Sequence, residues 1–121
     1  MSRVLVVEDD KYLSVAYRVT MEKAGFEFKM ATDGEEALGI LQDWIPQIIL
    51  LDLIMPRKDG FSTLADIKKD PRLMQIPVLV TSNLGQKEDF DRAMGMGATG
   101  FIIKSDSSPE EIVARIHSIV G

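Results

Sequence analysis

The stretch from Ile48 to Pro56 constrains the fold of this chain more than any other. Four large aliphatic residues, 48–51, stand in a row and run directly into Asp52. An unbroken apolar run of this length is typical of a strand that is buried on both faces of a parallel sheet. Pro56 then blocks continuation, and the turn pair Asp59-Gly60 follows. Because a carboxylate is costly to bury, we expect Asp52 to lie in an open crevice or to be paired. The alternative is an aspartate that only accepts hydrogen bonds from its own turn.

The composition is that of an ordinary globular domain. The 121 residues are 45% hydrophobic and 27% charged, so we expect one domain spanning residues 1–121. The absence of cysteine excludes disulfides and thiolate metal sites, and the single histidine, His117, excludes a multi-histidine site. A net charge of −5 argues against binding of nucleic acid by the chain itself. Its apolar runs are too short for a membrane span and its start does not resemble a signal peptide, so we expect a cytoplasmic protein.

Strand-like and helix-like segments alternate five times along the chain. The expected strands are residues 4–7, 26–30, 48–51, 76–80 and 101–103. The expected helices are residues 13–24, 33–41, 60–69, 86–94 and 109–120. Such alternation predicts an α/β fold in which a parallel sheet is covered by helices on both faces.

Local signals support this pattern. Asp33 and Glu36 form a predicted capping box at the second helix, and Ser108, Pro109 and Glu111 mark the start of the last helix. Residues 26–30 alternate between apolar and polar, which is typical of an edge strand. With the second strand at an edge we predict the flavodoxin-like doubly wound order 2-1-3-4-5. Its ligand crevice opens at the carboxyl ends of strands 1 and 3.

Chemistry-bearing residues follow four of the predicted strands. The first ends in Glu8-Asp9-Asp10, the third in Asp52, the fourth in Thr81 and the fifth in Lys104. Each has a simpler explanation when taken alone. The acids suit the start of a helix, Thr81 is a common strand residue, and Lys104 could be a solvated charge. The predicted topology brings all four strand ends to one edge, where several carboxylates repel one another unless a cation joins them. An all-oxygen site of this kind suits Mg²⁺.

These groups are suited to phosphoryl chemistry. A carboxylate can attack phosphorus to form an acyl phosphate, while a cation, a lysine and a hydroxyl bind the phosphoryl oxygens. No glycine-rich phosphate loop is present, which disfavours nucleotide and flavin phosphates. Leu53 and Ile54 follow Asp52 and offer no general acid or base, so we expect an aspartyl phosphate to persist. That favours a switch over a phosphatase.

The whole chain resembles the receiver domain of two-component response regulators. The resemblance is carried by the following motifs: Glu8-Asp9-Asp10; Asp33-Gly34-Glu35-Glu36-Ala37-Leu38; Asp52-Leu53-Ile54-Met55-Pro56 with Asp59-Gly60; Ile76-Pro77 leading to Thr81; and Gly97-Ala98 with Gly100-Phe101 before Lys104. Each motif is weak alone, but the ordered set is specific. A chemotaxis regulator of this family is a known example of the 2-1-3-4-5 order.

The resemblance implies a role for each of these positions. Asp52 resembles the phospho-accepting aspartate and Asp9 the principal Mg²⁺ ligand, while Glu8 would act through water and Ile54 through its backbone carbonyl. Thr81 and Lys104 resemble the hydroxyl and the lysine that hold the phosphoryl group. Phe101 resembles the switch aromatic that turns inward when Thr81 moves.

Three positions depart from the family pattern. Ser105 follows Lys104, where the family usually has proline after a cis peptide. A cis bond before a residue other than proline costs about 2.5–4 kcal/mol. The loop is therefore either trans, which could reposition Lys104, or strained. Lys58 stands where an apolar residue is common, and Phe101 lacks the hydroxyl of the more usual tyrosine.

The resulting hypothesis is a phosphorylation switch. A histidine kinase or a histidine phosphotransfer protein would donate to Asp52, and helix 86–94, strand 98–103 and helix 109–120 would repack to bind a downstream protein. Because no effector domain follows Gly121, output would pass by protein contact, by onward phosphotransfer or through a domain outside this sequence. One alternative is an interaction module that works without phosphorylation. A small Mg²⁺-dependent phosphohydrolase is the other.

Overall fold

A computed structural model describes residues 2–55, 58–83 and 86–121, so the prediction for Pro56 lies outside the described residues. Five parallel strands form one sheet in the order β2-β1-β3-β4-β5. The strands are β1 (Arg3–Val7), β2 (Glu27–Ala31), β3 (Ile48–Asp52), β4 (Val78–Ser82) and β5 (Gly100–Ile103). This order is the predicted one. Its reversal between β1 and β3 creates the topological switch point at which such sheets bind ligands.

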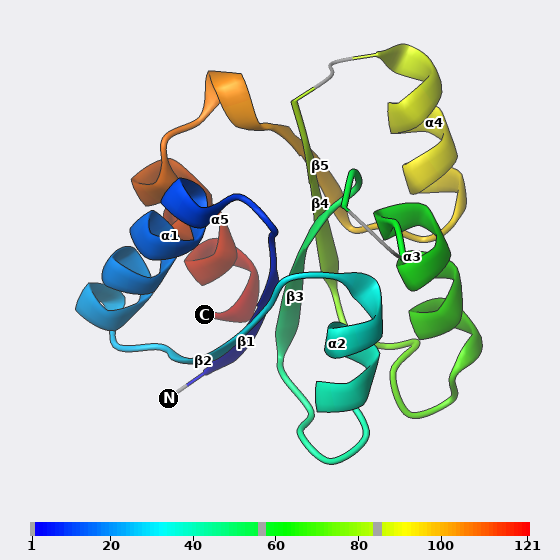
Figure 1. The fold of residues 1–121 in the computed structure, drawn as a ribbon, viewed down its shortest axis with the longest axis horizontal. Helices are drawn as coiled ribbons and strands as arrows, with labels where there is room; N and C mark the ends of the chain where they lie inside the picture. Colours follow the sequence, from blue (N-terminus) through cyan, green and yellow to red (C-terminus); the bar gives the residue numbers. More distant parts are fainter. Residues whose placement is uncertain (1, 56–57, 84–85) are drawn as a thin grey trace.

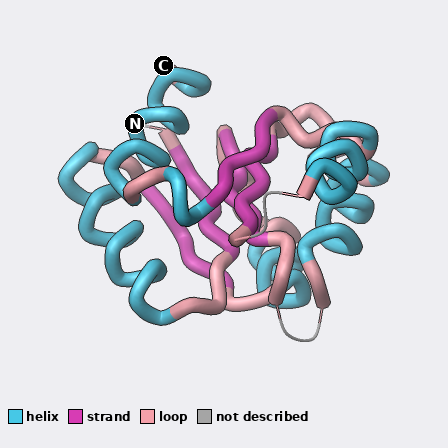
Figure 2. Tube along the Cα trace, turned by 90° about the horizontal axis from the view of Figure 1, so that it is seen from above, coloured by secondary structure: helices cyan, strands magenta, loops and turns pink. Residues whose placement is uncertain are grey.

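Helices cover both faces of the sheet (Figures 1 and 2). They are α1 (Lys11–Ala24), α2 (Gly34–Ile40), α3 (Gly60–Lys69), α4 (Lys87–Gly95) and α5 (Pro109–Val120), and a short 3₁₀ turn, η1 (Lys104–Asp106), follows β5. Helices α1 and α5 lie on one side, and α2, α3 and α4 lie on the other (Figure 1). Within the described residues, no helix has both the length and the apolarity needed to span a membrane.

Each face of the sheet packs into its own core. On the α1/α5 side, strand residues such as Val6, Leu50 and Leu79 are essentially inaccessible to solvent. On the opposite side, Val7, Leu51 and Val80 pack with α2, α3 and α4. The third strand is buried along its full length, as the apolar run predicts. Because side chains alternate between faces, residues two positions beyond Val6, Leu50 and Leu79 point to the α1/α5 side.

Most helix boundaries follow the expected capping chemistry. The Asp33 carboxylate accepts a hydrogen bond from the Glu36 N–H, as predicted (2.9 Å). The Glu36 carboxylate, however, accepts from the N–H of Thr32, one residue before the N-cap (2.6 Å). The last helix has the complete capping box of Ser108 and Glu111, with Pro109 in its first turn.

Boundaries near α4 differ from the sequence prediction by one or two residues. Helix α4 begins at Lys87 rather than Gln86, because Gln86 is the N-cap. Strand β5 begins at Gly100, one residue before the predicted strand 101–103 and two residues after the start of the wider output segment 98–103, because the N–H of Ala98 donates back to the carbonyl of Ala93 at the end of α4. Strand β4 begins after Pro77, which has no N–H for the ladder.

Candidate functional site

The sheet brings the predicted residues together at its carboxyl edge. Asp52 is the last residue of β3 and lies directly opposite Thr81 of β4. Val7 pairs with Leu51 in the neighbouring strand, so Glu8 follows at the level of Asp52. Glu8, Asp52 and Thr81 are all buried, at 2%, 4% and 1% exposure. Each of the three lies two positions after a strand residue that packs against α1 and α5. Because side chains alternate between the faces of a sheet, all three side chains point to the α1/α5 side.

The start of α3 fixes the backbone around Asp52. The Gly60 N–H donates to the carbonyl of Leu53 (2.9 Å), and a side-chain carbon at Gly60 would overlap the carbonyl oxygen of Asp52. Only glycine permits this close approach. The N–H of Ile54 donates to Asp52 Oδ1 (3.2 Å), which is the local turn contact considered as the alternative for Asp52. The turn therefore orients the carboxylate without accounting for its burial.

Lys104 supplies the positive charge at the site. Its Nζ lies 2.9 Å from Asp52 Oδ2 and 2.6 Å from Glu8 Oε1, and its side chain is 6% exposed. The described residues contain no cis peptide bond, and the chain after β5 forms the 3₁₀ turn η1. The Lys104-Ser105 peptide is therefore trans, and Lys104 nonetheless reaches both carboxylates. The expectation that a trans loop could reposition Lys104 away from the site is not met.

Burial and pairing shift the ionisation of these groups. Desolvation, together with the charge of Asp52, outweighs the hydrogen bond from Lys104 and raises the pKa of Glu8 to about 7. Desolvation lowers the pKa of Lys104, but the hydrogen bonds and charges of Glu8 and Asp52 raise it further, so the net shift is upward. Lys104 therefore stays protonated, while Glu8 exchanges its proton near neutral pH.

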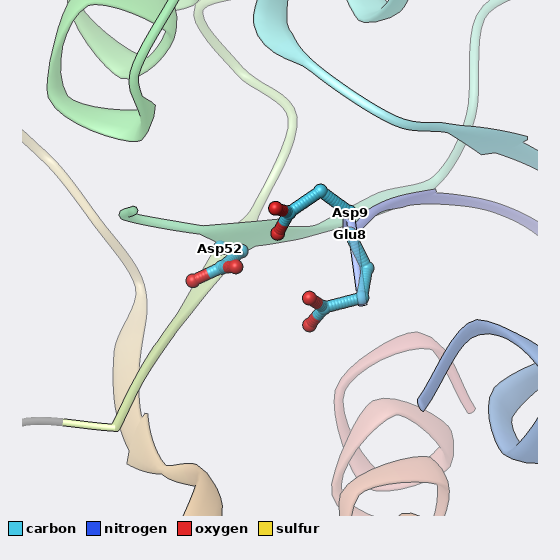
Figure 3. A group of neighbouring side chains, drawn as sticks. All are labelled: Glu8, Asp9 and Asp52. Carbon is cyan, nitrogen blue, oxygen red and sulfur yellow. The ribbon is translucent and has the colours of Figure 1, made fainter. Parts of the chain in front are cut away.

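Three carboxylates form a group that can hold a cation. One oxygen from each of Glu8, Asp9 and Asp52 lies within 4.8 Å of the others, and Figure 3 shows the side chains together at the ends of β1 and β3. Asp9 is exposed, whereas its two neighbours are buried. Asp10 instead accepts the N–H of Leu13 as the N-cap of α1 (3.0 Å). The helix-start explanation thus holds for Asp10. The oxygen-only set fits Mg²⁺, which prefers a few carboxylates and keeps several waters.

These groups open into a cavity of about 280 Å³. Its lining consists of Glu8, Asp9, Asp10, Asp52, Ile54, Asn83 and Lys104. Asn83 was not predicted as a site residue, although its position just after β4 could have indicated it. Ile54 is 59% exposed and stands at this opening. A larger hollow of about 440 Å³, lined in part by Phe26, His117 and Gly121, contains none of the site carboxylates.

Phe101 and Lys58 lie away from the carboxylates. Phe101 is half-buried, packs with the α2–α4 core and makes an edge-to-face contact with Phe90 of α4 (5.6 Å between ring centroids). Lys58 forms an ion pair with Asp66 of α3 (2.7 Å). The structure therefore brings Asp52, Glu8, Asp9, Thr81, Ile54 and Lys104 together and places Phe101 next to α4.

Comparison with known proteins agrees with this geometry. Residues 4–117 match the sequence model of the response regulator receiver domain. The master transcriptional regulator RpaA of Synechocystis is 32% identical over 120 residues, covering 99% of this chain and 49% of RpaA.

Solved structures show the same fold. The Mn²⁺-bound response regulator Rcp1 superposes with a TM-score of 0.86 at 29% identity, covering 98% of this chain and 93% of Rcp1. The chemotaxis response regulator CheY4 of Vibrio cholerae superposes with a TM-score of 0.90 at 27% identity, covering 98% of both chains. The chain spans about half the length of the curated relatives that it matches. The match over residues 4–117, together with the fold and the acidic site, establishes that the chain belongs to the response regulator receiver domain family, whose members are signalling switches of two-component systems.

Proposed function

We propose that Asp52 accepts a phosphoryl group from the phosphohistidine of a histidine kinase or of a histidine phosphotransfer protein. A carboxylate oxygen of Asp52 attacks phosphorus, the P–N bond to the donor histidine breaks, and an acyl phosphate forms on Asp52. The observation that carries this proposal is the setting of Asp52. It lies at the switch-point crevice with Lys104 Nζ 2.9 Å away and two further carboxylates beside it.

The neighbouring residues supply charge neutralisation and orientation. Glu8 (through water), Asp9, Asp52 and the backbone carbonyl of Ile54 would hold Mg²⁺, which neutralises charge on the phosphoryl oxygens when bound. The Lys104 ammonium and the Thr81 hydroxyl would bind the same oxygens from the side of β4 and β5. Since Lys104 already contacts Asp52, it needs only a small shift to follow the new phosphoryl group.

The output surface is proposed to consist of α4, β5 and α5. Phe101 of β5 contacts Phe90 of α4. If Thr81 moves and Phe101 changes its rotamer, this contact would be lost and the position of α4 against the sheet would change. The downstream partner is a protein that binds to this surface. Residues 1–121 would act as a single receiver domain that assists its own phosphotransfer and a slow dephosphorylation. The cytoplasmic location remains a prediction.

Mass spectrometry after incubation with a small phosphodonor and Mg²⁺ tests the proposal. We expect one phosphoryl group on the wild-type chain, none on Asp52→Asn and one on the matched control Asp59→Asn. Asp59 caps α3 and contributes no group to the cavity. An unmodified wild-type chain would instead support a module that works without phosphorylation. Continuous turnover of the phosphodonor would indicate a phosphohydrolase.

A further inference from the structure

Tyr17 carries a buried hydroxyl that has no hydrogen-bond partner among the described residues. The side chain is 1% exposed and packs in the core between α1, α5 and the sheet. A buried hydroxyl without a partner loses its hydrogen bonds to water and gains none in return, which destabilises the arrangement that contains it. Phenylalanine would fill the same space without this cost, so the hydroxyl calls for an explanation.

The position of Tyr17 relates the hydroxyl to the acidic site. It lies on α1 one turn after Ser14, whose hydroxyl donates to the backbone carbonyl of Glu8 (3.3 Å). Burial raises the pKa of the Tyr17 hydroxyl, and the charges of Glu8, Asp52 and Asp10 raise it further. The phenol is therefore within electrostatic reach of the site carboxylates and remains a hydrogen-bond donor at neutral pH.

The present partners of Glu8 show why a second donor is useful. Lys104 Nζ lies 2.6 Å from Glu8 Oε1, and the N–H of Asp10 donates to Oε2 (3.1 Å). A divalent cation bound between Glu8, Asp9 and Asp52 would repel the lysine ammonium, because both positive charges would occupy the same small space. A neutral phenol hydroxyl can donate to a carboxylate without this repulsion.

We propose that Tyr17 is a positioning residue of the cation site, whose hydroxyl donates to the Glu8 carboxylate in place of Lys104 when a divalent cation binds. The inference rests on the Mg²⁺ site proposed above and adds to it a residue from α1. Lys104 and Tyr17 then alternate as donors to Glu8. The lysine is released toward Asp52 and its phosphoryl group, while Glu8 keeps a fixed orientation toward the cation.

This exchange gives the Tyr17 hydroxyl opposite effects in two conditions. Without a divalent cation the hydroxyl lacks a partner, so Tyr17→Phe unfolds at the same temperature as the wild type or higher. With Mg²⁺ the hydroxyl bonds to a charged acceptor, and its removal weakens Mg²⁺ binding by about tenfold. Isothermal calorimetry and thermal unfolding with and without Mg²⁺ measure both effects. Tyr12→Phe is the matched control, since it makes the same change at a position of α1 that is 90% exposed.

A spectroscopic measurement on the unmutated chain completes the test. Tyr12 and Tyr17 are its two tyrosines, so tyrosine labelled at the ring carbon that bears oxygen gives one NMR signal from an exposed ring and one from a buried ring. We expect the Tyr17 signal to shift during a Mg²⁺ titration with the midpoint found by calorimetry, and the Tyr12 signal to stay unchanged. A Tyr17 signal that stays unchanged while Mg²⁺ binds would mean that the hydroxyl takes no part in the site, and the affinity of Tyr17→Phe distinguishes a hydrogen bond from a response to the nearby charge alone.

The outcomes separate this inference from the proposed function. Wild-type Mg²⁺ affinity in Tyr17→Phe, or a Tyr17 signal that does not respond to Mg²⁺, overturns the role of Tyr17 and leaves the phosphorylation site intact. If the wild-type chain binds no Mg²⁺ and accepts no phosphoryl group, the proposed function fails and the inference fails with it.

Discussion

Helices α5 and α4 lie next to each other in sequence order on either side of β5, yet they are held to the molecule very differently. Helix α5 begins with a complete capping box and Pro109, and buries Ile112, Val113 and Ile116. Helix α4 begins at Lys87 after an N-cap residue, Gln86, whose side chain makes no capping hydrogen bond, and it buries only Ala93. Helix α4 also makes the edge-to-face contact of Phe90 with Phe101 and places the Arg92 guanidinium over the ring of Phe61 of α3 (4.0 Å).

This difference separates the part of the molecule that holds the site from the part that can move. The carboxylates face the core built by α1 and α5, where close packing resists displacement. Helix α4 has few buried apolar contacts and an uncapped first turn, which are features of segments that open at low free-energy cost. Under the proposed function, phosphorylation of Asp52 would therefore move α4 without disturbing the scaffold that orients the carboxylates.

The largest expected effect is on the scaffold side. Ile116→Ala removes a fully buried side chain from α5 and is expected to lower the free energy of unfolding by about 2–5 kcal/mol. Urea unfolding monitored by circular dichroism measures the change. The matched control Ile119→Ala changes the same residue type on the same helix at a partly buried position, and its cost is expected to be clearly smaller. Equal costs would contradict the assignment of α5 to the rigid scaffold.

The second prediction concerns the ionisation of Glu8, a buried carboxyl in the part of the molecule that holds the site. Because burial raises the pKa of Glu8 to about 7, the carboxyl is mostly protonated at pH 6 and mostly ionised at pH 8. A cation needs the ionised form, so Mg²⁺ affinity is expected to increase about tenfold from pH 6 to pH 8. Without Mg²⁺, the quantity that depends on the ionisation of Glu8 is the stability of the fold, and it changes with pH in the opposite direction. A raised pKa means that the folded chain binds the extra proton, so the contribution of Glu8 to stability falls as pH rises from 4.5 to about 7.

Calorimetric Mg²⁺ titrations at both pH values check this prediction. The control Glu8→Gln has no carboxyl to titrate, so its Mg²⁺ affinity, although weaker, is expected to be nearly the same at pH 6 and pH 8. A wild-type affinity that does not change with pH would show that Lys104 keeps Glu8 ionised throughout this range.

The third prediction exchanges the capping of the two helices. Ser108→Ala removes the cap of α5 and is expected to cost about 1 kcal/mol, whereas Gln86→Asp adds a cap to α4 and is expected to stabilise it by up to about 1 kcal/mol. Hydrogen exchange measured by NMR would show slower exchange in α4 of Gln86→Asp, with α5 unchanged. Unaltered exchange in α4 would mean that its first turn is already fixed by other contacts.

Much of the site was predictable because it depends on strand ends. The apolar run before Asp52 and the alternation of strands and helices determine which residues meet at the carboxyl edge. Register then places Thr81 opposite Asp52. The edge position of residues 26–30 follows from their alternating pattern in the same way. These are regular features in which sequence spacing translates directly into position.

Other features depend on local geometry that spacing does not encode. Whether Lys104 reaches Asp52 depends on the conformation of the following 3₁₀ turn, and the missing proline suggested a displacement that does not occur. Tyr17 falls on the apolar face of α1, so helical periodicity identifies it only as a core residue. The proposed hydrogen bond to Glu8 depends on the position of the Tyr17 hydroxyl oxygen, which periodicity does not predict. Glu36 likewise reaches Thr32 rather than the expected N-cap because side-chain length and rotamer decide that contact.

The smallest expected effect on stability is at the contact that joins α4 to β5. Phe90 is 44% exposed and touches Phe101 edge to face (5.6 Å between ring centroids, 65° between ring planes). Phe90→Ala is expected to lower the free energy of unfolding by about 1 kcal/mol or less, since an aromatic pair contributes roughly that much and half of this ring is already in water. Its effect on α4 alone is expected to be larger, with faster hydrogen exchange in residues 87–95 and little change in α1 and α5.

Because the contact biases the position of α4 and not the carboxylates, phosphorylation of Asp52 in Phe90→Ala is expected to proceed at the wild-type rate. A global loss of stability comparable to that of Ile116→Ala would show that α4 belongs to the same cooperative unit as α5, and the distinction between scaffold and moving part would have to be abandoned.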